Sequence, residues 1–231
     1  MHELKSETRK RRGPGTSTLV VRGLFVVAAV LVVSGLGGSM GRVRAADEAA
    51  PVGSDLAARE LNELRLELES ARGELAVAKL QVERANAIMD YSRRYKVPAD
   101  LSASIYDIAL SEGIDPGLGF RLVRVESNFI LKARSNKNAI GYTQIRPATA
   151  RFYDPGITEE KLFDREVNLR LGFRFLKDLV RRYRGNLELA LLAYNRGPTT
   201  VDQIVAAGGD PTNGYEHAVL RGYRNQAPVS N

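Results

Sequence analysis

The residues best placed to do chemistry lie in the segment 122–129, which reads Leu-Val-Arg-Val-Glu-Ser-Asn-Phe. Successive residues of a helix are about 100° apart, so Glu126 falls one turn beyond Leu122, in a stripe shared with Val125 and Phe129. Desolvation on an apolar face and a position near a helix C-terminus both raise the pKa of a carboxyl group. A Glu that is still protonated near neutral pH can act as a general acid.

A second acidic side chain is missing from the same stretch. No Asp or Glu occurs between residues 127 and 153, and the first one after Glu126 is Asp154. Glycosidases with two carboxylates hold them about 5 to 9.5 Å apart, so a mechanism with a single acid is favoured here. The alternative is a structural role, in which Glu126 forms a half-buried salt bridge with Arg170 or Arg174.

Three short motifs occur in order along the chain: Glu126-Ser127, Gly141-Tyr142-Thr143-Gln144, and Ala-Tyr-Asn-Arg-Gly-Pro at 193–198. In sequence and spacing they resemble the signatures of soluble-type lytic transglycosylases. The catalytic domain of that family is lysozyme-like and related to goose-type lysozyme. The resemblance covers roughly residues 97–223, and three ordered motifs are far more specific than one.

The resemblance implies a role for individual residues. Glu126 would be the sole catalytic acid/base, Ser127 and Gln144 would line or orient the site, and Tyr194 and Asn195 would face the Glu across a groove. Substrate contacts are also expected at Gly141 and Tyr142.

The second motif departs from the family pattern, which usually reads Gly-Leu-Met-Gln; here Tyr142 and Thr143 replace Leu and Met. Tyr142 could stack on a sugar ring. At Gly141, either a close backbone approach to a sugar or an ordinary turn would explain the glycine.

The implied reaction is cleavage of the β-1,4 bond between N-acetylmuramic acid and N-acetylglucosamine in peptidoglycan glycan strands, with formation of a 1,6-anhydro sugar. A lysozyme-type hydrolase using Glu126 with water, a wall-binding module without catalysis, and a coiled-coil scaffold are the alternatives. No cofactor or metal is expected, because the chain has no cysteine and its only histidines are His2 and His217.

The charge of the 231-residue chain is concentrated near its beginning. The formal net charge of +7 divides into +6 for residues 1–45, −2 for 46–96 and +3 for 97–231. A nucleic-acid partner is therefore not expected, and a mildly basic domain suits an anionic wall polymer equally well.

The beginning of the chain has the pattern of an export segment. A basic cluster at 9–12 precedes an uncharged, apolar run at 23–41. Residues 1–45 are expected to be a signal peptide, with Val43-Arg44-Ala45 at the cleavage site, or a single anchor that contacts the membrane through 23–41. Either one would deliver the rest to the periplasmic side of a bacterial cell envelope.

After a linker at 46–53, residues 54–96 predict one long helix. Apolar residues keep a strict spacing of four and three, with Leu61, Leu68 and Leu75 at heptad position a. Acidic g and basic e positions suit a parallel homodimer through residues 54–89. The alternative is an amphipathic helix folded back onto the catalytic domain.

The remainder, residues 97–225, predicts a lysozyme-like, all-α domain, because helical spacing recurs and no alternating strand pattern is present. Asp115 and Asn186 are expected to cap helices, and Pro116 and Pro147 to begin them. The longest helix of the domain is expected at 164–182. Residues 226–231 are expected to be a disordered tail.

Overall fold

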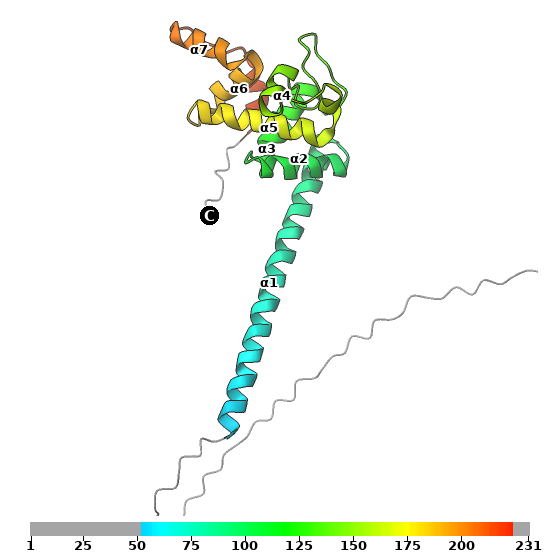
Figure 1. Cartoon of the computed structure of the whole chain (residues 1–231), viewed down its shortest axis with the longest axis vertical. Helices are drawn as coiled ribbons and strands as arrows, with labels where there is room; N and C mark the ends of the chain where they lie inside the picture. Colours follow the sequence, from blue (N-terminus) through cyan, green and yellow to red (C-terminus); the bar gives the residue numbers. More distant parts are fainter. Residues whose placement is uncertain (1–51, 224–231) are drawn as a thin grey trace, which may run out of the picture. The chain divides into compact units, whose positions relative to one another are not determined.

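The computed structural model describes residues 52–223, and side chains from Asp55 onward, as a set of helices (Figure 1). Within this range there is no strand, only two isolated bridges that join Ile140 to Arg134 and to Ile145. The predicted all-α fold is confirmed. In chain order the helices are α1 (Val52–Tyr95), α2 (Ala99–Ser111), α3 (Pro116–Ser127), α4 (Pro147–Tyr153), the 3-10 helix η1 (Glu160–Phe163), α5 (Arg165–Arg182), α6 (Leu187–Arg196), α7 (Pro198–Ala206) and α8 (Tyr215–Leu220).

Local capping explains where several helices begin. The Asp115 carboxylate accepts a hydrogen bond from the backbone N–H of Leu118 at 2.9 Å, and Pro116 occupies the first turn of α3. The Asn186 side chain caps α6 in the same way, with a bond of 3.0 Å from the N–H of Leu189. The two caps predicted from the sequence are confirmed.

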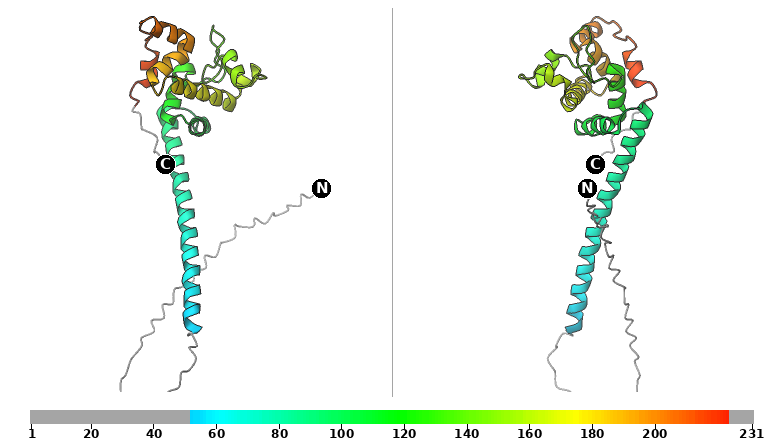
Figure 2. Two further views of the ribbon diagram at one scale, coloured as in Figure 1. Left: turned by 60° about the vertical axis from the view of Figure 1, so that its left-hand side comes forward. Right: turned by 90° about the vertical axis from the view of Figure 1, so that its right-hand side faces the viewer.

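The main core of the domain lies between α2, α3 and α5. Phe120 and Leu122 of α3 and Phe173 of α5 are fully buried within it. In Figure 2, α5 lies beside α2 and α6, and it is in contact with both. This packing holds the C-terminal end of α3, which carries Glu126, within the domain rather than at its outer surface.

Two ion pairs that share one buried carboxylate connect α2 and α5. Glu112, at the end of α2, accepts hydrogen bonds from Arg170 at 2.9 Å and from Arg174 at 3.0 Å. Burial alone would raise the pKa of Glu112, but the bonds from the two guanidinium groups outweigh it and lower that pKa. Both arginines are therefore committed to Glu112.

The helix α1 contacts the domain only through its last turns. Every described residue from 55 to 86 is exposed, which contradicts the alternative of a helix folded back along its length. Near its end, the Tyr91 ring stacks on Phe120 at 4.3 Å between centroids, and Ile88 is buried. The C-terminal turns of α1 thus belong to the same core as α3.

Several predicted segments lie outside the described residues: the export or anchor segment at 1–45 with its apolar run at 23–41, most of the linker at 46–53, and the tail at 226–231. The linker is shorter than predicted, because α1 already begins at Val52. Between residues 52 and 223, no helix combines the length and apolar character needed to cross a bilayer.

Candidate active site

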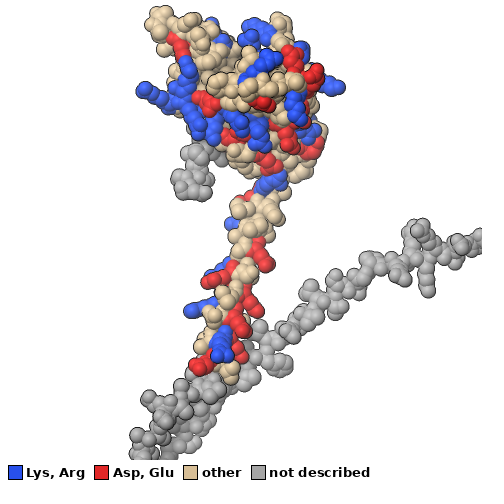
Figure 3. All heavy atoms as spheres, viewed as in Figure 1, with Lys and Arg blue, Asp and Glu red and all other residues tan. Residues whose placement is uncertain are grey.

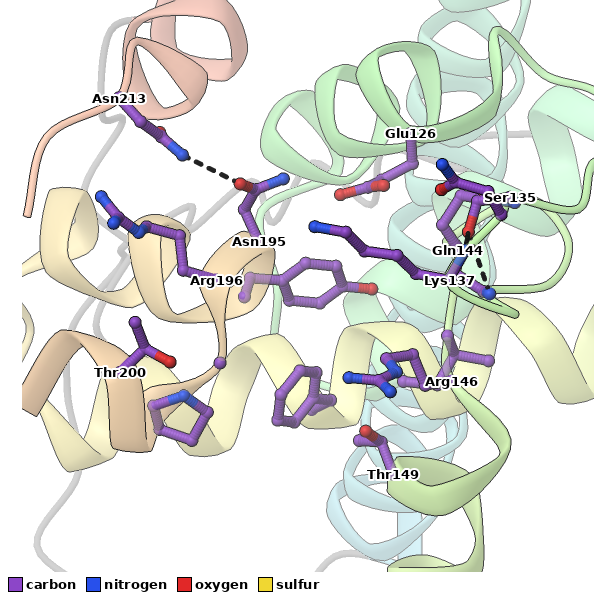
Figure 4. A pocket seen from close by; sticks show the side chains of 17 residues that line it. Glu126, Ser135, Lys137, Gln144, Arg146, Thr149, Asn195, Arg196, Thr200 and Asn213 are labelled. Atoms are coloured by element: carbon purple, nitrogen blue, oxygen red, sulfur yellow. Dashed lines mark hydrogen bonds between the residues drawn. The ribbon is translucent and has the colours of Figure 1, made fainter.

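A cavity of about 940 Å³ opens beside the C-terminal end of α3. Its walls come from segments that are far apart in the sequence: the end of α3, the loop before α4, the middle of α5 and the junction between α6 and α7 (Figure 4). Among the residues that the structure describes, Glu126 is the only acidic one in the lining. The other lining residues that matter below are Ser135, Lys137, Gln144, Arg146, Tyr194, Asn195 and Asn213.

Glu126 lies in the last turn of α3, which ends where Asn128 adopts a left-handed conformation with φ 48°. The side chain is partly buried, and the Tyr215 hydroxyl donates a hydrogen bond to its Oε1. Burial raises the pKa of Glu126 to about 7, and the bond from Tyr215 acts in the opposite direction. A carboxyl group with this pKa is largely protonated below neutral pH and can both release and accept a proton.

The alternative of a structural salt bridge is contradicted. Arg170 and Arg174 both pair with Glu112, and none of the ion pairs within residues 55–223 includes Glu126. The predicted apolar stripe is also wrong at one position, because Val125 is 37% exposed. Glu126 therefore lies at the edge of the buried face of α3, where its carboxyl group meets the cavity.

Three of the predicted site residues join Glu126 in the cavity lining: Gln144, Tyr194 and Asn195. The Tyr194 hydroxyl donates to the carbonyl of Thr143 at 2.8 Å, which ties α6 to the loop before α4. The Asn195 Oδ1 accepts a bond of 3.0 Å from Asn213 (Figure 4). The Gln144 Nε2 donates to the carbonyl of Gly141 at 3.0 Å and to that of Ala133 at 3.2 Å, whereas the Gln144 Oε1 has no hydrogen-bond partner within residues 55–223.

The other three predicted residues do not line the cavity. Ser127 is buried, and its hydroxyl lies 2.8 Å from the Tyr142 carbonyl and 3.1 Å from that of Val123. It holds the 141–144 segment against α3, which is an orienting contact. Tyr142 is 5% exposed and belongs to the core, so its ring offers no open face for a sugar.

Gly141 is required by packing. Its φ is +78°, and a Cβ added there would lie 2.2 Å from the Nδ2 of Asn168. Asn168 is fully buried, and its amide bonds to the carbonyls of Ile140 and Leu162 at 2.9 and 2.8 Å. The glycine thus makes room for an internal side chain instead of a sugar.

Asn168 also forms hydrogen bonds with Thr143. Its Oδ1 accepts bonds of 2.9 Å from both the N–H and the hydroxyl of Thr143. The Thr143 side chain also packs against Gly172, where an added Cβ would lie 2.3 Å from that of Thr143. A buried network with Asn168 therefore holds the loop that carries Gln144.

Sequence reasoning missed Tyr215, Asn168 and the basic lining. Lys137 and Arg146 extend into the cavity (Figure 4), and neither side chain has a hydrogen-bond or ion-pair partner among residues 55–223. The sequence offered one signal, a run of basic residues without an acid after Glu126. Nothing local pointed to Tyr215, which is 89 residues from its partner. Within the described residues, no cluster of three or more His, Cys, Asp or Glu could hold a metal ion.

Part of the chain is similar to known proteins. A family model described as the transglycosylase SLT domain matches residues 104–213. A structure of an inactive mutant of the lytic transglycosylase Slt from Pseudomonas aeruginosa aligns with 29% identity over 51% of this chain and 22% of that one, with a TM-score of 0.44. The 70 kDa soluble lytic transglycosylase from Escherichia coli aligns with 24% identity over 56% of this chain and 24% of that one, with a TM-score of 0.46. The matched part spans about a quarter or less of either protein.

Proposed function

We propose that this protein is a peptidoglycan lytic transglycosylase, a carbon-oxygen lyase, because residues 104–213 match the model of the transglycosylase SLT domain family. It would cleave the β-1,4 bond between N-acetylmuramic acid and N-acetylglucosamine and leave a 1,6-anhydro-muramoyl end. The observation that carries the proposal is Glu126: a carboxyl group with a pKa of about 7, at the wall of a large cavity that no other acidic side chain of residues 55–223 lines.

The reaction uses one group twice. Protonated Glu126 donates its proton to the glycosidic oxygen as the bond from that oxygen to the muramoyl C1 breaks. The Glu126 carboxylate then accepts the proton of the muramoyl C6 hydroxyl as that oxygen bonds to C1. The carboxyl group ends the cycle protonated, so the reaction consumes no water and requires no second carboxylate.

Tyr215 supports the ionised stage of this cycle. Burial raises its pKa well above the usual value, so the phenol remains protonated and donates to Glu126. The bond favours the carboxylate over the neutral acid and limits the effect of burial. Tyr215 therefore keeps the pKa of the acid close to neutrality, where a single group can serve as both acid and base.

The substrate class is supported by the charge of the lining. Lys137 and Arg146 extend into the cavity, neither has a carboxylate partner within residues 55–223, and Glu126 is neutral in the reactive state. Muramoyl residues carry lactyl and peptide groups with carboxylates, which such cations attract. This favours peptidoglycan glycan strands over an uncharged polysaccharide.

The place of action follows from the expected export segment at 1–45. Whether it is cleaved or retained as an anchor through 23–41, the domain is delivered to the periplasmic side of the envelope. There it would meet the wall.

Digestion of purified sacculi by the purified chain, with product masses measured directly, tests the activity. We expect muropeptides with anhydro ends, each lighter by one water than the hydrolytic product, and their loss with Glu126→Gln. Reducing ends without anhydro sugars would identify a hydrolase instead. Sacculus binding by both forms without any released product would identify a wall-binding module.

A further inference from the structure

The exposed part of α1 carries large apolar side chains in a regular pattern. Their exposed fractions include 64% for Leu61 and 69% for Leu75, and no residue between 55 and 86 is covered by the domain. Contiguous exposed apolar surface of this kind marks a binding face. We define the seam as the residues at heptad positions a and d of this helix: Ala57, Leu61, Leu64, Leu68, Ala71, Leu75, Ala78, Val82, Ala85 and Met89.

We propose that this seam binds a second copy of the chain as a parallel, in-register, two-stranded coiled coil. The period of 3.5 residues keeps the seam facing a partner helix over more than four heptads. An isolated helix in water gains little from its own hydrogen bonds, so a helix of this length is stabilised mainly by packing. The small Ala residues at most d positions allow the two backbones to approach closely.

The charges beside the seam determine the direction of the partner. The g positions Glu60, Glu67 and Glu74 are all acidic, and the e positions Arg65, Arg72 and Lys79 are all basic. In a parallel pair in register, each g residue faces the e residue of the next heptad of the partner, which gives three attractive pairs on each side. In an antiparallel pair, g would face g and e would face e, and like charges would repel.

A membrane surface is a poorer partner for this face. A helix that lies on anionic lipids has a broad apolar side and a polar side rich in Lys and Arg. Residues 56–89 instead contain five basic and six acidic side chains. Figure 3 shows both signs along α1. The narrow seam with mixed charges at its borders suits another helix of the same kind.

The catalytic domain does not occupy the seam. It contacts α1 through Arg84, which pairs with Asp107, and through Ile88 and Tyr91. These three residues form one face of α1. Around the helix axis, at 100° per residue, the centre of this face is about 110° from the centre of the seam. Met89, the last seam residue, remains 47% exposed. A parallel pair would therefore carry two cavities at the same end of a rod about 50 Å long.

Disulfide trapping in the full-length chain tests the proposal, because the native chain has no cysteine. The variants Leu61→Cys, Leu75→Cys and Val82→Cys place a single thiol on the seam at three heights. Matched controls are Leu66→Cys and Leu80→Cys, whose parent residues are similarly exposed (59% and 65%) but lie at position f, away from the seam. Each protein is oxidised in a glutathione buffer, and linked dimers are measured on non-reducing gels.

Each of the three seam variants should form linked dimers several-fold faster than either control. Rates equal to those of the controls would overturn the proposal. Faster linkage between Leu61→Cys and Val82→Cys in a mixture than within either variant alone would also overturn it, since that result requires an antiparallel pair.

A charge exchange gives a second readout that leaves the apolar seam intact. In the Leu75→Cys background, Glu67→Arg places like charges opposite each other and should slow linkage, and adding Arg72→Glu should restore it. Equal linkage in all three proteins would count against the assigned register. None of these measurements uses wall cleavage, so their failure would leave the proposed activity untouched.

Discussion

At the scale of single residues, the site rests on the balance between two influences on Glu126. Burial at the edge of the core raises its pKa, and the Tyr215 hydroxyl lowers it. The resulting pKa, about 7, suits the proposed reaction, because a group that must both give and take a proton near neutral pH is most effective with a pKa close to that pH. The same balance can be measured through stability and through activity.

The burial of Glu126 should be visible in the pH dependence of folding. A folded pKa of about 7 against an ordinary value of 4.5 means that the native state binds more protons between these values, so stability falls as pH rises through this window. In Glu126→Gln the side chain does not ionise, so this decrease in stability with rising pH should disappear. The variant should be more stable than the native chain by up to about 3 kcal/mol at pH 8 and by little at pH 4. Denaturant unfolding at both pH values measures it, and an equal difference at the two would contradict the raised pKa.

Loss of the Tyr215 hydroxyl should shift the pH profile of the reaction. Without this donor the Glu126 carboxylate is less stable, its pKa rises, and the acid stays protonated to higher pH. For Tyr215→Phe we expect the alkaline limb of kcat/KM to move up by about 0.5 to 1 pH unit. Tyr194→Phe is the control, because that hydroxyl bonds to Thr143 and not to Glu126. A limb that moves equally in both variants would argue against a specific effect of Tyr215.

At the scale of elements, the loop before α4 is held by contacts with α5 rather than by its own turns. Asn168 of α5 bonds to Ile140 and Thr143, and Gly141 lies directly against its amide. Ser127 adds a bond from the end of α3. The position of Gln144 in the cavity depends on these buried contacts.

Alanine substitutions at two glycines should distinguish the effect of this packing on the free energy of unfolding from the effect of backbone conformation. Gly141 and Gly185 have φ of +78° and +86°, but an added Cβ meets Asn168 at the first and nothing within 4 Å at the second. Gly185→Ala should lower the free energy of unfolding by about 1 kcal/mol through its φ alone. Gly141→Ala should cost about 1–3 kcal/mol more, because the buried Asn168 must move. Thermal unfolding measures both, and equal losses would mean that Asn168 yields without cost.

At the scale of the whole molecule, α1 has two parts with different surroundings. Residues 55–86 are exposed, whereas Tyr91 and Tyr95 pack on Phe120 with ring centroids 4.3 and 5.3 Å apart. The last turns of α1 are therefore part of the domain core, across the predicted domain border at 96/97. The exposed part carries most of the seam and is accessible to a partner helix.

Substitutions in the two parts should differ in their effect on stability. Tyr91→Ala removes a ring stacked on Phe120 and should lower the free energy of unfolding of the domain by about 2–3 kcal/mol. Leu66→Ala, in the exposed part and off the seam, should change it by less than about 0.5 kcal/mol. Unfolding followed by tyrosine fluorescence compares them. A similar small effect of both substitutions would show that the domain is stable without α1.

The sequence by itself determined the all-α fold, the helix starts at Asp115 and Asn186, the heptad spacing of α1, and the lack of an acidic residue between Glu126 and Asp154. These features depend on capping, on the periodicity of apolar residues and on which residue types occur in a segment, all of which can be read from the local sequence. Only the tertiary structure decided that Tyr215 reaches Glu126, that Glu112 takes Arg170 and Arg174, and that Asn168 occupies the space beside Gly141. Each of these contacts joins residues from 27 (Gly141 and Asn168) to 89 (Glu126 and Tyr215) positions apart, and which side chain fills a buried space depends on how whole helices pack.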